Sequence, residues 1–151
     1  MVVGVTGGIA SGKTTVAQML ADLGAGVIMD ADQIGRTVVE RDPALLNQLV
    51  QSFGQGIITL EGTLDRRKLG RMAFSSGAAR DTLNAIVHPP LLRELTAQVD
   101  RAAMACPKRP IIIDAALLSE WMLHPTSRHL LPHIDIVVVV TAHEATQVDR
   151  L

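Results

Sequence analysis

The sequence has 151 residues, 48% of them hydrophobic, and a formal net charge of −1. This length and composition suit one main domain with a sizeable core, and the near-neutral charge argues against a surface that binds a polyanion. Aromatic residues make up 2% of the chain and tyrosine is absent, so the stacking platforms of single-stranded nucleic-acid binders are missing. We therefore expect no nucleic-acid partner.

The sequence also argues against a membrane partner. It contains no run of about 18 consecutive apolar residues, as a membrane-spanning helix needs, and its first residues already form a strand pattern, which leaves no room for a signal peptide. The lone Cys106 cannot form an internal disulfide and suits a reducing compartment. We expect a cytoplasmic protein, and the sequence leaves its oligomeric state open.

The first predicted elements flank a glycine-rich loop. A mostly β-branched run over residues 1–6 predicts a buried strand, and Gly7–Thr14 then fits the phosphate-binding pattern G-x-x-x-x-G-K-[ST]. In that pattern the glycines let backbone N–H groups surround phosphate oxygens, the lysine reaches the outer phosphates, and the last hydroxyl can bind Mg²⁺. The apolar stripe of the helix that should follow consists of Val16, Met19, Leu20 and Leu23.

The loop therefore predicts binding of a nucleotide triphosphate at a helix N-terminus, where unpaired N–H groups favour negative charge. The residues predicted to bind the triphosphate are Gly8, Ile9, Ala10, Ser11, Gly12, Lys13, Thr14 and Thr15.

Helical patterns dominate after a second short strand over residues 27–29. Asp42 and Pro43 predict the N-cap and first position of a helix that runs to Phe53. Another helix should begin near Asp65, and His88-Pro89-Pro90 should interrupt a later one. The apolar positions after this interruption are Leu91, Leu92, Leu95, Val99 and Ala102.

Strand patterns return at residues 111–114 and 134–140, both apolar enough to be buried on two faces. Strands separated by helices predict a parallel sheet with right-handed crossovers, in the three-layer α/β/α fold of P-loop NTPases. Residues 1–30 and 106–151 would form the nucleotide-binding core, and residues 31–105 a helical insertion that binds the acceptor substrate.

The end of the chain predicts one more helix. Thr141 and Glu144 match a capping box, yet little more than two turns follow before Leu151. Because isolated short helices are only marginally stable, we expect the natural protein to continue beyond this residue.

Acidic residues follow two of the predicted strands. Asp30 and Asp32 end the second strand, where a carboxylate can accept the proton of an attacking hydroxyl or help to bind the metal. The alternative is that Asp30 caps the next helix and that Asp32 only interacts with its dipole. Asp114 ends the third strand and predicts Mg²⁺ support, directly or through water, with helix capping as its alternative.

Basic residues provide candidates for an acceptor site. Arg36 lies one turn after Asp32 and could pair with it or bind a substrate phosphate. The stretch Asp65-Arg66-Arg67-Lys68 with Arg71 concentrates positive charge in the insertion, which could also be only a solvated helix face.

The whole pattern resembles the dephospho-coenzyme A kinase family, with matches in the family's order along the chain. The matching segments are Gly4–Ala17, Asp30-Ala31-Asp32 with Arg36, Gly62–Arg66 with Leu69, Phe74, His88-Pro89, Leu117-Leu118 with Glu120, and Gln147 with Arg150-Leu151.

This resemblance implies transfer of the γ-phosphoryl group of ATP to the ribose 3′-hydroxyl of dephospho-coenzyme A, the last step of coenzyme A synthesis. It implies Asp32 as the general base, Lys13 on the ATP phosphates, and Mg²⁺ bound by Thr14 with Asp114. The acceptor site would comprise Asp32, Arg36, Arg66, His88, Leu117 and Leu118.

Three departures from the family pattern matter. Ala10 replaces a usual glycine, which the loop tolerates if φ of this residue is negative. Asp114-Ala115-Ala116 and Ser119 replace a segment that commonly has a proline and an aromatic residue. The family also continues for about fifty residues more, with an arginine-bearing lid. The alternatives are a truncated or degenerate module that binds nucleotide or coenzyme A without turnover, and a kinase for another small acceptor such as a nucleoside monophosphate.

Overall fold

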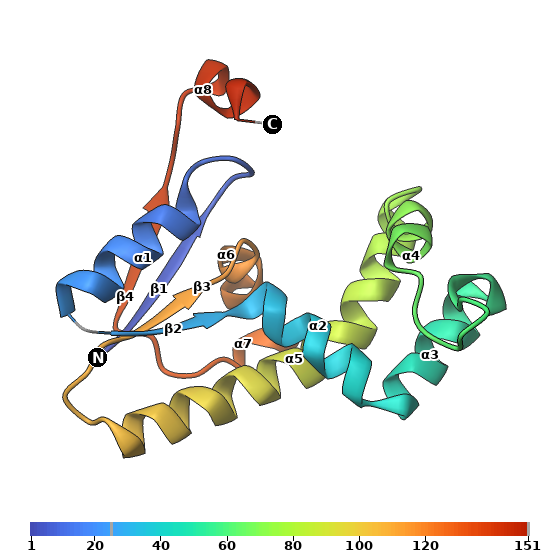
Figure 1. Cartoon of the computed structure of the whole chain (residues 1–151), viewed down its shortest axis with the longest axis horizontal. Helices are drawn as coiled ribbons and strands as arrows, with labels where there is room; N and C mark the ends of the chain where they lie inside the picture. Colours follow the sequence, from blue (N-terminus) through green and yellow to red (C-terminus); the bar gives the residue numbers. More distant parts are fainter. Residues whose placement is uncertain (25, 151) are drawn as a thin grey trace. The chain divides into compact units, whose positions relative to one another are not determined.

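The computed structural model describes residues 1–24 and 26–150, with all their side chains except those of residues 126 and 144. The strands of this part are β1 (Val2–Gly7), β2 (Val27–Asp30), β3 (Ile111–Asp114) and β4 (Ile136–Val140). They form one sheet in the order β2-β3-β1-β4 (Figure 1), and every neighbouring pair is parallel. The predicted parallel α/β sheet is confirmed.

Helices cover both faces of this sheet. Val3 and Val5 of β1 pack with Ala17 and Ala21 of α1 (Lys13–Gly24). Because successive residues of a strand point to opposite faces, Gly4 faces the other side. There Leu118, the first residue of α6 (Leu118–Leu123), packs so closely that a β-carbon at position 4 would collide with it. The sheet is therefore the middle of three layers, as predicted.

Two predicted burial patterns are wrong, the first of them in part. On α1 the predicted Val16 and Leu20 do pack on the core beside the buried Ala17 and Ala21, whereas Met19 is 59% exposed and Leu23 is 87% exposed. The small alanines let α1 lie close to the sheet, so the buried face is centred on them and leaves Met19 and Leu23 outside. The β4 strand begins at Ile136 and is largely exposed, because it lies at the edge of the sheet and pairs only with β1.

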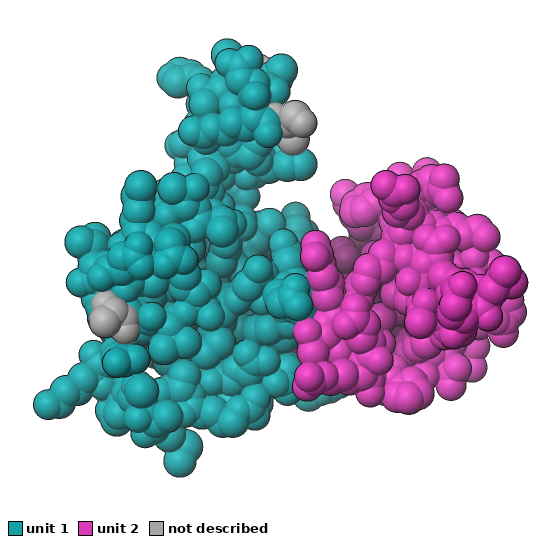
Figure 2. Space-filling view, viewed as in Figure 1, with its two compact units in different colours: residues 1–34, 92–151 teal, residues 35–91 magenta. Residues whose placement is uncertain are grey.

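The chain divides into two compact units, coloured separately in Figure 2: unit 1 contains residues 1–34 and 92–151, and unit 2 contains residues 35–91. The boundaries fall inside helices α2 (Ala31–Arg41) and α5 (Gly77–Ala105), not at residues 30/31 and 105/106. The second half of α5 belongs to unit 1, since the Thr96 hydroxyl donates to the carbonyl of Leu130 at 2.7 Å.

Unit 2 has its own apolar core. Its further elements are α3 (Pro43–Phe53), the 3₁₀ turn η1 (Gln55–Ile57) and α4 (Arg66–Ala73). The Asp42 side chain caps α3 and the Asp65 side chain caps α4, which confirms both predicted helix starts. The core residues are Val39, Leu45, Leu49, Phe53, Ile57, Leu69 and Ala73.

The predicted interruption at Pro89-Pro90 is wrong, because α5 runs through both prolines. A proline inside a helix removes a backbone hydrogen bond and costs about 3 kcal/mol. Apolar contacts on either side offset this cost: Ile86 and Val87 pack on the unit 2 core, and Leu92 and Leu95 are fully buried. Tertiary packing thus outweighs the local signal.

The last elements of unit 1 are α7 (Pro125–Arg128) and α8 (Glu144–Asp149). A helix does follow, but it begins two residues later than a cap at Thr141 predicts: His143 is the N-cap residue of α8 and makes no side-chain capping bond. The side chain of Glu144, the other half of the predicted capping box, lies outside the described residues. Leu151 lies outside the described residues. Among the helices of the described residues, none is both long and apolar enough to cross a membrane.

Candidate functional site

Strand register gathers the predicted site residues of unit 1 at one end of the sheet. Asp30 of β2 pairs in register with Asp114 of β3, which in turn pairs with Val5 of β1. Gly7, where the phosphate loop begins, pairs with Val140 at the end of β4. The carboxyl ends of parallel strands are the usual place for a ligand site in an open α/β sheet, and here they bring two carboxylates and the loop together.

Asp114 contacts both functional side chains of the loop. Its Oδ1 accepts a hydrogen bond from Lys13 Nζ at 2.6 Å, and its Oδ2 accepts one from the Thr14 hydroxyl at 2.8 Å. The Asp114 side chain is only 6% exposed and that of Lys13 is 15% exposed. This shielding strengthens the attraction between the two charges relative to water. The cluster fixes Lys13 and Thr14 at the N-terminus of α1.

The backbone of the loop is unusual at Ala10. Its φ is +56°, so the expectation of a negative φ at this alanine is wrong. Ala10 is the one non-glycine residue with positive φ in the described chain, and an L-residue in this region carries strain of about 1–2 kcal/mol. The Ser11 N–H donates a hydrogen bond of 3.2 Å to the Gly8 carbonyl, and the turn that this bond closes requires the positive φ of Ala10. Such strained residues concentrate at functional sites.

Ser11 contributes a second unusual feature to the loop. Ser11 is 5% exposed, and its Oγ has no hydrogen-bond partner among the described atoms. A buried hydroxyl without a partner is costly. Within a phosphate loop, an incoming phosphate oxygen is the natural acceptor for this group.

Arg150 is a further site candidate: it matches the family pattern in sequence, but that match alone indicates no role for it. Its Nη1 donates to the Ala10 carbonyl at 3.2 Å and lies beside Gly12, so α8 ends next to the loop (Figure 1). The side-chain oxygen of Gln147, one turn earlier, lies beside Gly8. The spacing of Gln147 and Arg150 on one helix face was the available signal. Without the fold, nothing related this face to the loop.

The two carboxylates after β2 differ in their contacts. Asp30 Oδ1 accepts a hydrogen bond from Gln33 N–H at 2.9 Å, so Asp30 caps α2, as one of the alternatives predicted. Asp32 is exposed in the first turn of α2, and no ion pair or hydrogen bond engages its carboxylate within the described chain. Of the two, Asp32 is the carboxylate available to a substrate.

Unit 2 contains three of the predicted acceptor residues. Arg66 Nη2 donates to the carbonyl of Arg36 at 3.0 Å and to Glu40 Oε1 at 2.8 Å. Arg66 therefore braces α4 against α2, while the Arg36 side chain is exposed. His88 lies half-buried in α5.

Leu117 and Leu118 lie in unit 1, where the chain leaves β3. Leu118 is fully buried against Gly4, whereas Leu117 is partly exposed. The Thr6 hydroxyl donates to the Ala116 carbonyl at 3.0 Å and fixes the segment that precedes them. In this conformation only Leu117 offers surface to a ligand.

Comparisons with known proteins agree with this geometry. A family model described as dephospho-CoA kinase matches residues 1–151. The chain is 46% identical to a dephospho-CoA kinase of Leifsonia xyli subsp. xyli, over 99% of this chain and 71% of that protein. It is 40% identical to a dephospho-CoA kinase of Bacillus licheniformis, over 100% of this chain and 71% of that protein.

Solved structures support the same fold. The crystal structure of TT1252 from Thermus thermophilus is similar at a TM-score of 0.74 and 27% identity, covering 99% of this chain and 70% of that chain. A dephospho-CoA kinase from Campylobacter jejuni is similar at a TM-score of 0.62 and 16% identity, covering 99% and 92%, which supports the fold alone. A family match over the full length, together with a phosphate loop whose lysine and threonine converge on one buried aspartate, establishes that this chain belongs to the dephospho-CoA kinase family.

Proposed function

We propose that this chain transfers the γ-phosphoryl group of ATP to the ribose 3′-hydroxyl of dephospho-CoA and yields coenzyme A and ADP. The observation that carries the proposal is the cluster of Lys13, Thr14 and Asp114 beside the phosphate loop. Membership of the dephospho-CoA kinase family supports the choice of acceptor. Phosphoryl transfer depends mostly on positioning and on charge stabilisation, and the cluster is suited to both.

The loop would bind the triphosphate through the backbone N–H groups of Gly8 to Thr15, with Lys13 on the outer phosphates. The buried hydroxyl of Ser11 would gain the acceptor that it lacks. Arg150, beside Ala10 and Gly12, would add a guanidinium, whose planar donors match phosphate oxygens.

A magnesium ion fits the oxygen atoms of Thr14 and Asp114. These oxygens are 2.8 Å apart, and Mg²⁺ prefers oxygen ligands while keeping several waters. When bound, Mg²⁺ neutralises charge that develops on the phosphates. Thr14 would bind it directly and Asp114 directly or through water.

Asp32 is the proposed general base. Its carboxylate is exposed and unengaged within the described chain, so it can accept the proton of the 3′-hydroxyl as that oxygen attacks the γ-phosphorus. Arg36, Arg66, His88, Leu117 and Leu118 are proposed to line or organise the acceptor site. Arg66 would act through its brace on α2, and the buried Leu118 through packing.

The test is product formation from ATP, Mg²⁺ and dephospho-CoA, followed as ADP and coenzyme A by chromatography. Asp32→Asn should lower kcat by about 10²–10⁴, the usual contribution of a general base, with ATP affinity retained. Asp30→Asn is the matched control, because asparagine caps a helix as well as aspartate, and it should keep the wild-type rate. Equal rates for Asp32→Asn and wild type would refute the role of Asp32.

A screen of other acceptors distinguishes the two alternative functions. ADP release with a nucleoside monophosphate but not with dephospho-CoA would indicate a kinase for another acceptor. Nucleotide binding without any turnover would indicate a binding module. The cytoplasmic location stays a prediction, which fractionation of cells that produce the protein would test.

A further inference from the structure

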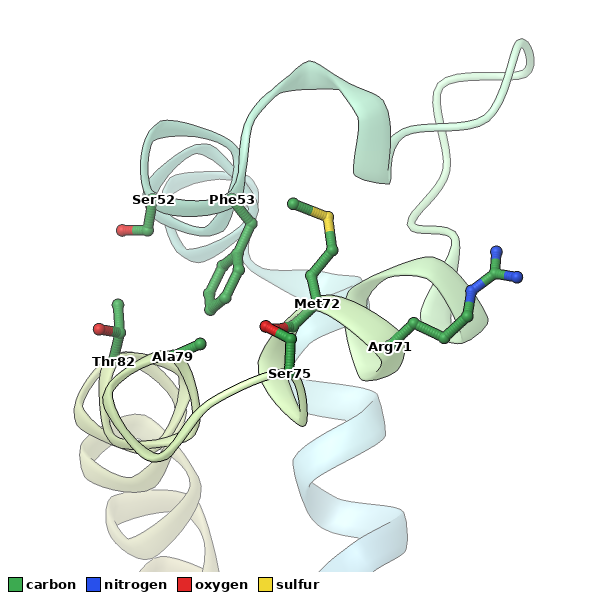
Figure 3. Close-up of a pocket in the computed structure, with 7 residues that line it drawn as sticks. All are labelled: Ser52, Phe53, Arg71, Met72, Ser75, Ala79 and Thr82. Atoms are coloured by element: carbon green, nitrogen blue, oxygen red, sulfur yellow. The ribbon is translucent and has the colours of Figure 1, made fainter.

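A pocket of about 410 Å³ lies within unit 2, between the C-terminal ends of α3 and α4 and the start of α5 (Figure 3). We propose that this pocket binds the amide-bearing arm of the acceptor, with Arg71 on the phosphate to which the arm is attached. The proposal rests on the proposed function, since it adds a binding surface for the acceptor named there. The lining residues are Ser52, Phe53, Arg71, Met72, Ser75, Ala79 and Thr82.

The inner wall of the pocket is apolar and well supported. Phe53 is 8% exposed and belongs to the unit 2 core, against which Ala79 also packs. Figure 3 shows the Phe53 ring directed toward Ser75 and Ala79, with the Met72 side chain beside it. A floor anchored in the core keeps its shape without a ligand, and such a floor favours aliphatic groups.

Two of the three hydroxyl groups that line the pocket, those of Ser75 and Thr82, are arranged as hydrogen-bond acceptors. Ser75 Oγ donates its proton to the Met72 carbonyl at 2.7 Å, and Thr82 Oγ1 donates to the Ala78 carbonyl at 2.9 Å. Each oxygen keeps lone pairs for a ligand but has no second proton to give. The pocket therefore suits a ligand that brings N–H donors along an aliphatic chain.

Arg71 adds a positive charge outside this pocket: it is one of the lining residues, and Figure 3 shows its guanidinium extending away from the other lining side chains. Its guanidinium is exposed, and no ion pair or hydrogen bond engages it within the described chain. Arg67 lies one turn earlier on α4, and like charges at this spacing repel each other. An anion on Arg71 relieves this repulsion, and a guanidinium matches a phosphate in shape and in donor number.

The acceptor of this family has the required chemistry. Dephospho-CoA contains an aliphatic arm with two amide N–H groups, joined at one end to a phosphate. The pocket volume lies within the range of about 300–1,000 Å³ that small-molecule sites have. We assign the arm to this pocket because its two amide N–H groups match the acceptor oxygens of Ser75 and Thr82.

The first experiment uses matched variants. Arg71→Gln and Ala79→Leu should raise KM for dephospho-CoA by about tenfold or more, as expected when a charged hydrogen bond or the space for a ligand is lost, with kcat and KM for ATP unchanged. The matched controls are Arg67→Gln on the same helix and Ala78→Leu beside Ala79, neither of which lines the pocket. They should keep the wild-type KM.

The second experiment distinguishes the arm from the rest of the acceptor. 4′-Phosphopantetheine should compete with dephospho-CoA but not with ATP, and its affinity should fall in Arg71→Gln. Inorganic phosphate at the same concentration should compete weakly, since it lacks the arm. If Ala79→Leu proves unstable in thermal unfolding, Arg71→Gln and the competition assay still decide the matter.

Two negative results of these experiments lead to different conclusions. Wild-type turnover with equal KM values for Arg71→Gln, Arg67→Gln and wild type overturns the pocket assignment alone. A wild-type enzyme that makes no coenzyme A, while 4′-phosphopantetheine still binds in an Arg71-dependent way, contradicts the proposed reaction and leaves the pocket in place.

Discussion

Two ion pairs of similar length, one in each unit, show how burial changes the contribution of an ion pair to stability. In unit 1, Lys13 and Asp114 meet at 2.6 Å with side chains that are 15% and 6% exposed. In unit 2, Arg66 and Glu40 meet at 2.8 Å with side chains that are 41% and 64% exposed. The distances are similar, but water screens the second pair far more. Distance alone therefore does not rank these contacts.

The largest effect is expected from Lys13→Met, which leaves the buried carboxylate of Asp114 without its cation. Breaking a buried pair on one side typically costs 3–5 kcal/mol, and we expect about 3 kcal/mol because Lys13 is partly exposed. Urea unfolding measures the loss. The double variant Lys13→Met/Asp114→Asn should recover part of it, since no unpaired charge remains. A single variant as stable as wild type would contradict the comparison.

A moderate effect of opposite sign is expected from Ala10→Gly. Glycine adopts the positive φ of this position without strain, and we expect a gain of about 1 kcal/mol, since the greater freedom of glycine in the unfolded chain offsets part of the relief. Thermal unfolding should show a rise of about 2–4 °C. Ala85→Gly, in an exposed turn of α5, is the control and should lower the melting temperature instead.

A small effect is expected from Glu40→Gln in unit 2. Exposed ion pairs typically contribute about 0.2–1 kcal/mol, and the Arg66 guanidinium keeps its bond to the Arg36 carbonyl. Urea unfolding at low salt should detect at most this loss, and about 1 M salt should abolish it by screening. A loss as large as that of Lys13→Met would mean that exposure does not separate the two pairs.

The smallest effect is expected from Asp135→Asn, because asparagine keeps an acceptor oxygen for the hydrogen bond that the exposed carboxylate makes. The Val2 N–H donates to Asp135 Oδ2 at 2.7 Å and, with a smaller contribution from nearby His133, lowers the pKa of this carboxyl. A lowered folded-state pKa contributes stability above the unfolded value of about 3.9, and this stability is lost as pH falls through the folded pKa. The melting temperatures of variant and wild type should therefore begin to converge at about pH 4 and should coincide once the pH is below the lowered folded-state pKa.

Local patterns predicted the elements whose neighbours in sequence decide their conformation. Asp42-Pro43 and Asp65 start helices because a capping side chain acts on the next three residues. The apolar run at residues 111–114 forms a strand buried throughout. Residues 136–140 are similarly apolar, but the prediction that they are buried is wrong, because β4 lies at the edge of the sheet and is largely exposed.

Predictions failed where distant residues compete with a local signal. The two prolines at positions 89 and 90 should break a helix, yet buried leucines and the unit 2 core keep α5 continuous. Half of the predicted stripe of α1, Met19 and Leu23, is exposed, because close approach to the sheet selects the alanines for the buried face. The φ of Ala10 likewise follows from how the loop closes, which the residue type alone does not reveal.

The sequence by itself determined the phosphate loop, the parallel α/β fold and the family, because glycine spacing, strand patterns and capping residues act over a few positions and keep their order along the chain. Only the tertiary structure decided which side chains meet. Asp114 reaches Lys13 and Thr14 from about a hundred residues away, and Arg150 reaches Ala10 from 140 residues away. Such contacts depend on strand register and on packing between elements, which no local pattern encodes.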